Sequence, residues 1–247
     1  MRQAGGNLRR PGIKMLEEPP LITINSNIRR PSVAQIAGFQ NIPTGFVVDA
    51  MYGAGALDRQ IQPVGAGRDI RCVAAGPALT ADCGPADILA LLASLNFIQN
   101  GDIVVSSFGG HQGCASVGDR VMGMIKNSGG AGLVTDGPAR DYDGIVEVGL
   151  PLWCTGLTPA SPFSNGPGRV GFAVQLGGQE VETGDMIIAD RDGVVVVPFE
   201  RIDETLENLQ RVEVAERQRD KQVADGLKVP QDIVDLLASD RVKFTPN

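Results

Sequence analysis

Residues 101–141, GDIVVSSFGGHQGCASVGDRVMGMIKNSGGAGLVTDGPARD, decide the fold of this chain. Two short apolar runs, 101–107 and 131–136, are predicted to be strands, and apolar residues recur at helical spacing between them. A strand, a helix and a second strand over this length make a βαβ unit, in which the strands are parallel and the crossover is almost always right-handed. The stretch therefore predicts an α/β fold built on a parallel sheet.

The helix between the two strands carries signals at both ends. Ser116, followed three residues later by Asp119, matches a capping box, and Gly129-Gly130 is typical of a helix end. Its apolar stripe consists of Val121, Met122, Met124 and Ile125. We expect this stripe to pack against the sheet.

The loops that follow the two strands, 108–118 and 137–144, should leave the same edge of the sheet, because the strands are parallel. This arrangement brings the helix start at Gly118-Asp119 opposite the pair Arg140-Asp141. The planar guanidinium of Arg140 is suited to a carboxylate, and the unpaired N–H groups from Gly118 to Val121 form a second anion site. The substrate is therefore expected to be an acid.

Asp141 is the candidate ligand for a divalent metal cation, Mg²⁺ or Mn²⁺, because such ions prefer oxygen ligands and keep several waters. Asp119 is expected to hold a metal-bound water by hydrogen bonds. A cation and an arginine that converge on a small carboxylate suit a 2-oxo acid, whose neighbouring C–C bond breaks through an enolate. No lysine lies in either loop, so a Schiff-base mechanism has no candidate there.

Each of these residues also has a purely structural interpretation. Arg140-Asp141 can be a surface ion pair that caps a helix starting near Asp141. Asp136 can cap the turn after its strand, and Asp143 can be a solvated acid in a first helical turn. His111 and Cys114 have no partner that spacing reveals, which favours an ordinary loop histidine and a buried thiol over catalytic groups.

The rest of the chain continues the α/β pattern. Further strands are predicted at 71–81, 149–157, 169–178 and 186–198, and further helices at 84–95, 200–224 and 229–238. Pro85 is expected in the first turn of the helix that begins near residue 84. Residues 1–31 lack periodicity and are interpreted as an N-terminal arm that packs late or across a subunit boundary.

Composition excludes several classes of function. The chain has 247 residues, a net charge of -7 and scattered basic residues, which argues against nucleic acid as a partner. No apolar run approaches the roughly 18 residues of a membrane helix, and no secretory signal is evident, so we expect a soluble cytoplasmic protein and no membrane partner. The four cysteines match neither a metal knuckle nor a disulfide framework.

Several motifs, in this order and spacing, resemble the RraA-like proteins, which include the 4-hydroxy-4-methyl-2-oxoglutarate/4-carboxy-4-hydroxy-2-oxoadipate aldolases. The motifs are GPALT (76–80), GDIVV (101–105), VGDRVM leading into GLVTDGPARDYD, then GLPLW and GDMIIADRDGVVVVP. The match covers roughly residues 32–225, which would form the catalytic domain, followed by a helical tail over 226–247. The resemblance implies a three-layer β/β/α swivelling-type domain that assembles as a homotrimer or a homohexamer.

The resemblance also assigns roles. It places the substrate-binding loop on Gly118, Asp119, Arg120 and Val121, the substrate arginine on Arg140 and the metal-binding aspartate on Asp141. An acid from a neighbouring subunit's C-terminal helix would correspond to Glu213 or Glu216. The aldolase signature has an acid three residues after the metal aspartate, where this chain has Gly144, so that either Asp143 substitutes or the substrate range differs.

The function implied is that of a divalent-metal-dependent class II aldolase, a lyase that releases pyruvate from a 4-hydroxy-2-oxo acid and can also decarboxylate oxaloacetate. Two alternatives remain open at this point. One is a non-enzymatic regulator that binds ribonuclease E, and the other is an enzyme of the same mechanism acting on another 2-oxo acid. The family also carries older methyltransferase labels, for which no cofactor loop is evident in this sequence.

Overall fold

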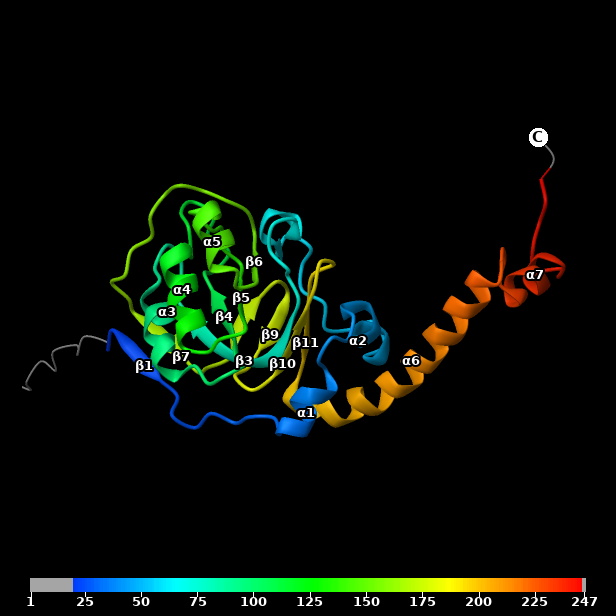
Figure 1. The fold of residues 1–247 in the computed structure, drawn as a ribbon, viewed down its shortest axis with the longest axis horizontal. Helices are drawn as coiled ribbons and strands as arrows, with labels where there is room; N and C mark the ends of the chain where they lie inside the picture. Colours follow the sequence, from blue (N-terminus) through cyan, green and yellow to red (C-terminus); the bar gives the residue numbers. More distant parts are fainter. Residues whose placement is uncertain (1–19, 246–247) are drawn as a thin grey trace, which may run out of the picture.

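The computed structural model describes residues 20–245 and is organised around a mainly parallel sheet (Figure 1). The strands at its centre are β3 (Ala74–Asp82), β4 (Ile103–Ser107), β5 (Gly132–Thr135) and β6 (Leu152–Cys154). Each pairs in parallel with the next, with Val104 opposite Leu133 in the β4–β5 ladder. The parallel βαβ unit predicted from residues 101–141 is therefore confirmed.

Helices cover one face of this sheet and a β-hairpin covers the other. The helices are α3 (Leu89–Ser94), α4 (Asp119–Asn127) and α5 (Tyr142–Val148), and the hairpin consists of β8 (Val174–Leu176) and β9 (Gln179–Val181). Because both faces are covered, all five residues of β4 are buried, as expected for a parallel strand inside an α/β protein. The predicted β/β/α layering is confirmed.

Strand β3 belongs to three ladders, with β10, β4 and β7, and joins two hydrophobic cores. Its first half pairs antiparallel with β10 (Met186–Ala189), which continues into β11 (Val194–Val197), and its second half pairs with β4. The larger core lies around the parallel strands, whereas the smaller one lies between β10, β11 and the helices α1 (Val33–Gly38), α2 (Thr44–Ala50) and α6 (Ile202–Ala224). The remaining short elements are β2 (Gln62–Pro63), which pairs with β6, and the 3₁₀ turns Val64–Gly67, Leu95–Phe97 and Phe199–Arg201.

The described part of the N-terminal arm packs on its own chain. Strand β1 (Ile22–Ile24) pairs in parallel with β7 (Gly168–Val170), and Arg30 forms an ion pair with the buried carboxylate of Asp102. Strand β1 thus completes an edge of the sheet, and the described residues of the arm contact their own chain. The first part of the predicted arm lies outside the described residues.

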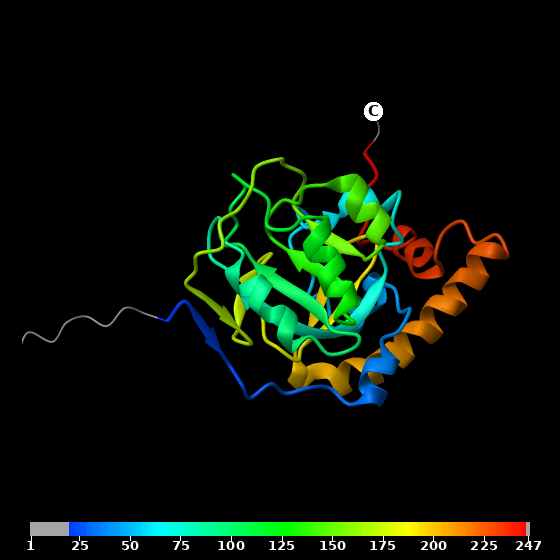
Figure 2. The same ribbon diagram turned by 60° about the vertical axis from the view of Figure 1, so that its left-hand side comes forward.

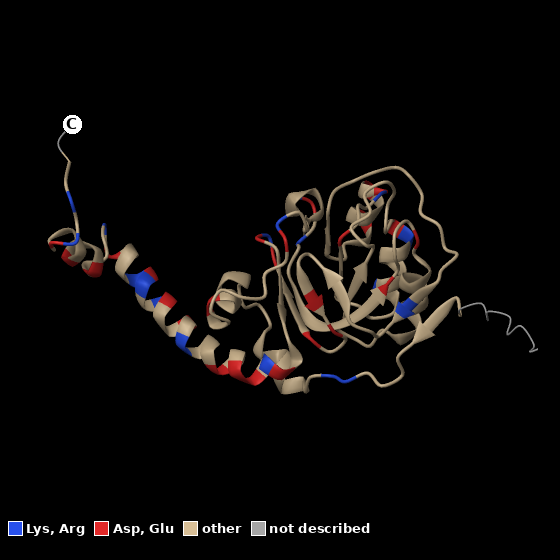
Figure 3. Cartoon of the chain, turned by 180° about the vertical axis from the view of Figure 1, so that it is seen from behind, with Lys and Arg blue, Asp and Glu red and all other residues tan. Residues whose placement is uncertain are grey.

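The C-terminal helices extend away from the body, as Figures 1 and 2 both show. The first turns of α6 bury Ile202, Thr205, Asn208 and Leu209, but the remainder of α6 and helix α7 (Gln231–Leu237) are largely exposed. Both helices were predicted. Seen from behind, acidic and basic residues are interspersed along α6 and scattered over the body, without a basic strip (Figure 3).

Two local predictions are wrong. Ser116 is not a helix cap, because its buried hydroxyl donates to Pro138 O at 3.0 Å, and α4 begins instead with Gly118 at its N-cap. Pro85 lies in a turn, because the Asp87 carboxylate accepts the N–H of Leu89 at 2.8 Å and delays the start of α3.

Most of the predicted apolar stripe of α4 is buried, whereas Met124 is 40% exposed. Between residues 20 and 245, no helix is both long enough and apolar enough to cross a membrane.

Candidate active site

The loops after β4 and β5 run side by side and form one wall of a cavity of about 360 Å³. Val117 and Ala139 form a parallel β-bridge, and the N–H of Arg140 donates to Val117 O at 3.0 Å. The cavity is lined by Ile88, Val117, Gly118, Asp119, Arg120, Val121, Arg140, Asp141 and Pro162. All six residues that the sequence singled out for this site therefore meet in one place.

Asp141 directs its carboxylate towards the cavity because of an unusual backbone conformation. With φ 60° and ψ 48°, it is a non-glycine residue in the left-handed region, immediately before α5. Such conformations cost free energy and often occur at functional sites. Asp141 occupies the N-cap position of α5, but its side chain makes no capping hydrogen bond. The capping interpretation of this residue is therefore wrong.

Arg140 is held at the cavity by two side chains. Its Nη1 donates to Ser161 Oγ at 2.5 Å, and its Nε lies 3.2 Å from Asp141 Oδ2. The predicted ion pair exists, but both side chains are partly exposed, at 36% and 46%, so the pair contributes little to stability. This leaves the guanidinium and the carboxylate available to a ligand.

Gly118 allows the two loops to approach closely. A Cβ atom added at this position would lie 2.7 Å from Asp141 Oδ2 and 3.2 Å from Arg140 Cγ. Any side chain would therefore displace one of the two charged residues. The glycine is required by packing, since its φ of -137° is ordinary extended backbone.

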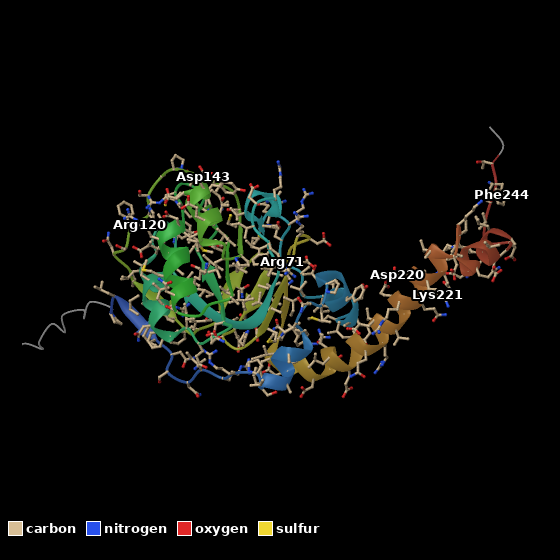
Figure 4. The ribbon with its side chains drawn as sticks, in the orientation of Figure 1. Arg71, Arg120, Asp143, Asp220, Lys221 and Phe244 are labelled. Carbon is tan, nitrogen blue, oxygen red and sulfur yellow. The ribbon has the colours of Figure 1, made fainter. Side chains whose placement is uncertain are left out.

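The start of α4 offers fewer free N–H groups than the sequence suggested. The N–H of Arg120 donates to Asp119 Oδ1 at 2.6 Å, so this group is already satisfied by the helix's own first residue. The backbone amides of Asp119 and Val121 remain as candidates for an anion, at the positive end of the helix dipole. The Arg120 side chain is exposed at the outer end of α4 (Figure 4).

The donor atoms at the cavity fit a hard divalent cation that keeps most of its water ligands. Within residues 20–245, no group of three or more His, Cys, Asp or Glu side chains is arranged to hold a metal. Magnesium needs only one or two protein carboxylates, with waters and substrate oxygens completing its shell. Asp141, with Asp119 on the same cavity wall, matches that requirement.

The other candidate residues have structural roles. The Asp136 carboxylate accepts the N–H groups of Phe108 and Gly110 and organises that loop, while burial raises the pKa of this carboxyl. Asp143 is exposed in the first turn of α5 (Figure 4) and does not line the cavity, so its predicted substitution for the acid missing at Gly144 is not seen. His111 packs its ring edge against Phe108, and Cys114 is buried.

Two features of the site were not predicted. Ile88 and Pro162 form an apolar part of the wall, and Ser161 anchors Arg140, but these residues come from segments outside the βαβ unit. Glu213 and Glu216 lie on α6 and do not line this chain's own cavity; Glu213 pairs with Arg217 at 2.7 Å.

Comparison with known proteins places this site in context. Residues 44–196 match the model of the RraA-like family, described as Aldolase/RraA. A protein of Halalkalibacterium halodurans named "Putative 4-hydroxy-4-methyl-2-oxoglutarate aldolase" is 31% identical over 192 residues, which are 78% of this chain and 90% of the relative.

Solved structures show the same fold. Streptomyces coelicolor RraAS2, described as an unusual member of the RNase ES inhibitor RraA protein family, superimposes with a TM-score of 0.66 at 28% identity, over 78% of this chain and all of that one. The RNA-processing inhibitor RraA from Thermus thermophilis gives a TM-score of 0.57 at 25% identity, over 64% of this chain and 94% of that one. The family model matches more than half of the chain, and the relative from Halalkalibacterium halodurans aligns with most of it. This protein therefore belongs to the RraA-like family.

Proposed function

We propose that this protein is a divalent-metal-dependent lyase that cleaves a 4-hydroxy-2-oxo acid and releases pyruvate. The observation that carries the proposal is the convergence of Arg140, Asp141, Asp119 and the α4 N-terminus on one cavity of about 360 Å³. That volume suits a small acid. The name of the relative from Halalkalibacterium halodurans supports the same class of reaction.

The charged groups of the cavity have distinct tasks in the proposed reaction. Arg140 binds the carboxylate of the pyruvyl portion through its planar fork and stabilises the negative charge that develops on the 2-oxo oxygen. The free amides at the start of α4 bind the second carboxylate of the substrate. Ser161 and the Arg140–Val117 backbone bond keep the guanidinium in place while the charge develops.

The bond changes follow from retro-aldol chemistry. The 4-hydroxyl loses its proton and its oxygen forms a carbonyl at C4, while the C3–C4 bond breaks and its electron pair forms the pyruvate enolate. The C4 fragment leaves as a second carbonyl compound, and C3 of the enolate takes a proton from water. A divalent cation held by Asp141 would polarise the 2-oxo group and make this bond cleavable. Asp119 positions the water that accepts the hydroxyl proton. The same enolate chemistry accounts for decarboxylation of oxaloacetate as a second activity.

We also propose that the protein forms a homotrimer or a homohexamer. Helix α6 extends away from its own cavity, so Glu213 or Glu216 can reach an active site only if that site belongs to another subunit. Exposed apolar side chains on the C-terminal arm, which comprises residues 210–245 from the later turns of α6 onward, support such an assembly. They are Val214, Val223, Val229, Ile233, Val234, Leu237 and Phe244.

The proposed activity is tested by pyruvate release in an assay coupled to lactate dehydrogenase. The substrates are 4-hydroxy-4-methyl-2-oxoglutarate and oxaloacetate, each with Mg²⁺ or Mn²⁺ and then with EDTA. We expect turnover that depends on the metal. The absence of release from both substrates, although Mn²⁺ binds, would contradict this choice of substrate and favour the same chemistry on another 2-oxo acid.

A protein-binding regulator is the second candidate, because two solved relatives are named as inhibitors of RNA processing or of RNase ES. The two functions differ in their dependence on Asp141. A regulator would bind ribonuclease E equally well before and after Asp141→Ala and would release no pyruvate. An enzyme would lose its metal-dependent turnover in that variant.

A further inference from the structure

A long loop without helices or strands supplies part of the candidate active site. This segment, residues 155–167, connects β6 to β7 around one side of the body and is called the crossing loop (Figure 1). Its residue Pro162 lines the cavity, and the neighbouring Ser161 Oγ accepts the hydrogen bond of 2.5 Å from Arg140 Nη1. The direction of the Arg140 guanidinium therefore depends on what holds the crossing loop in place.

Backbone hydrogen bonds attach the crossing loop to the body before and after the residues that reach the cavity. On the near side, the Thr158 N–H donates to Ala139 O at 2.9 Å. On the far side, the Phe163 N–H donates to Ala86 O at 2.8 Å, and Phe163 O accepts the Ile88 N–H at 2.9 Å. The far end of the crossing loop therefore rests on the segment that leads into α3.

The side chain of Asp87 adds the stronger part of this attachment. Asp87 is only 9% exposed, and its Oδ2 accepts the N–H of Asn165 at 2.6 Å and that of Gly166 at 3.1 Å, both in the crossing loop. Its Oδ1 accepts the N–H of Leu89 at 2.8 Å, where α3 begins. Hydrogen bonds to a carboxylate are stronger than those between neutral groups. One buried side chain therefore joins the start of a helix to the end of the crossing loop.

The backbone next to Asp87 depends on the same contact. Ala86 has a φ of 61°, in the left-handed region that a residue with a Cβ atom rarely adopts. Such a conformation costs free energy and persists only where its surroundings hold it. Here Ala86 O accepts the Phe163 N–H of the crossing loop, and Asp87 binds the loop through its side chain. The two segments therefore fix each other's conformation.

We propose that Asp87 is a positioning residue: its carboxylate fixes the crossing loop and, through Ser161, holds the Arg140 guanidinium at the cavity. The inference rests on the proposed function, in which Arg140 binds the carboxylate of the pyruvyl portion. Asp87 does not line the cavity, and none of its three hydrogen bonds described above goes to the loop after β5, which carries Asp141. Loss of the Asp87 carboxylate should therefore weaken substrate binding and leave the metal affinity intact.

The variant Asp87→Ser separates the two tasks of this side chain. A serine hydroxyl can still accept the N–H of Leu89, two residues further on, so the start of α3 keeps its cap. With one oxygen on a shorter side chain, it cannot also reach the N–H groups of Asn165 and Gly166. The variant should therefore fold and release only the crossing loop.

The matched control is Asp185→Ser. Asp185 is 3% exposed, and its two oxygens accept the N–H groups of Glu182 at 2.8 Å and Phe199 at 2.9 Å. None of these three residues lines the cavity. The control therefore removes a similarly buried carboxylate, with the same kind of backbone partners, outside the candidate site.

We expect Asp87→Ser to lower kcat/KM by at least about tenfold, mainly through a higher KM, because Arg140 is no longer held for the substrate carboxylate. The Mn²⁺ affinity measured by electron paramagnetic resonance should stay within about twofold of the wild-type value. Asp185→Ser should keep kcat/KM within the same about twofold range. An unchanged kcat/KM in Asp87→Ser, or an equal loss in both variants, would overturn the proposal.

A double-mutant cycle shows whether the effect passes through Ser161. Ser161→Ala removes the hydroxyl that accepts from Arg140 and should lower kcat/KM to a similar extent. Adding Asp87→Ser to this variant should cause less than about threefold further loss, because the link that Asp87 supports is already absent. Losses that multiply independently would contradict the proposal.

The inference and the proposed function can fail separately, because hydrogen–deuterium exchange of the crossing loop needs no substrate. Exchange at the amides of Asn165 and Gly166 should be slow in the wild type, although Asn165 is exposed, and fast in Asp87→Ser. If the wild type releases no pyruvate, the proposed function is wrong for both substrates, and this exchange then decides the inference. Fast exchange in the wild type would overturn the inference, and this result is decisive even if Asp87→Ser fails to fold.

Discussion

Gly118 sets the distance between the two charged loops at the scale of a single residue. Because a Cβ atom there would lie 2.7 Å from Asp141 Oδ2, Gly118→Ala should push this carboxylate away from the cavity. We expect Mn²⁺ affinity to fall by at least about tenfold, or about 1.4 kcal/mol. Titration followed by electron paramagnetic resonance measures this loss, with Gly123→Ala as the control, because a Cβ atom at that position of α4 would meet only Val148 Cγ2, at an ordinary 3.9 Å. Wild-type affinity in Gly118→Ala would show that Asp141 does not hold the metal.

The burial of the four cysteine thiols determines their pKa and their reactivity. All are buried and free, and burial raises the pKa of Cys83 and of Cys154 to about 11. An unfolded thiol titrates near 9, so the stability contributed by these two thiols is full below that pH and is lost as the pH rises towards 11.

We therefore expect no rapid reaction of the native protein with Ellman's reagent at about pH 8, because only the thiolate is reactive. All four thiols should react once the protein is denatured. Rapid labelling of one thiol in the native state would show that this thiol is more exposed, or more readily ionised, than the structure indicates.

At the scale of elements, helix α5 is braced where it begins. Tyr142 Oη donates to Asp69 Oδ2 at 2.5 Å, and its ring lies against Gly65, where an added Cβ atom would be 2.1 Å from the hydroxyl. The bond to Asp69 raises the pKa of the Tyr142 hydroxyl. This brace adjoins Asp141, whose left-handed backbone needs support from its surroundings.

Tyr142→Phe should therefore lower kcat several-fold, by about 1 kcal/mol in activation free energy, without unfolding the protein. Tyr52→Phe is the matched control, because Tyr52 is the other tyrosine of the chain, is largely exposed, and contacts only Asn208 of α6 through its hydroxyl. Steady-state kinetics of both variants provide the measurement. Equal activities in the two variants would argue against a role for the brace.

Much of the arrangement of elements around the candidate site could be predicted from the sequence. Strands and helices around residues 101–141 followed from periodicity, and parallel pairing then placed Gly118 and Asp119 beside Arg140 and Asp141. The capping box failed because Ser116 satisfies a carbonyl of the neighbouring loop, a tertiary contact that no local pattern contains. Ser161 was missed for a similar reason, since a distant loop brings it to Arg140.

At the scale of the whole molecule, the exposed apolar residues of the C-terminal arm are the main structural support for the proposed oligomer. Ile233, Val234 and Leu237 are 40%, 44% and 47% exposed on α7 and form an apolar surface that a partner subunit can cover. The double variant Ile233→Glu/Leu237→Glu should lower the molar mass in solution to that of a monomer, as measured by light scattering. Asp232→Lys, an exposed polar change on the same helix, should leave the oligomer intact.

A wild-type monomer, or an unaltered oligomer in the double variant, would contradict this role for α7. A wild-type monomer would also remove the proposed contribution of Glu213 or Glu216 to a neighbouring active site.

The central claim, that Asp141 holds the metal of a lyase, is tested most directly by pyruvate release from Asp141→Asn at saturating Mn²⁺. The matched control is Asp143→Asn, because Asp143 lies two residues away but is exposed outside the cavity. We expect Asp141→Asn to lose at least about a hundredfold in kcat/KM and Asp143→Asn to retain wild-type turnover. Equal turnover in the two variants would contradict the claim.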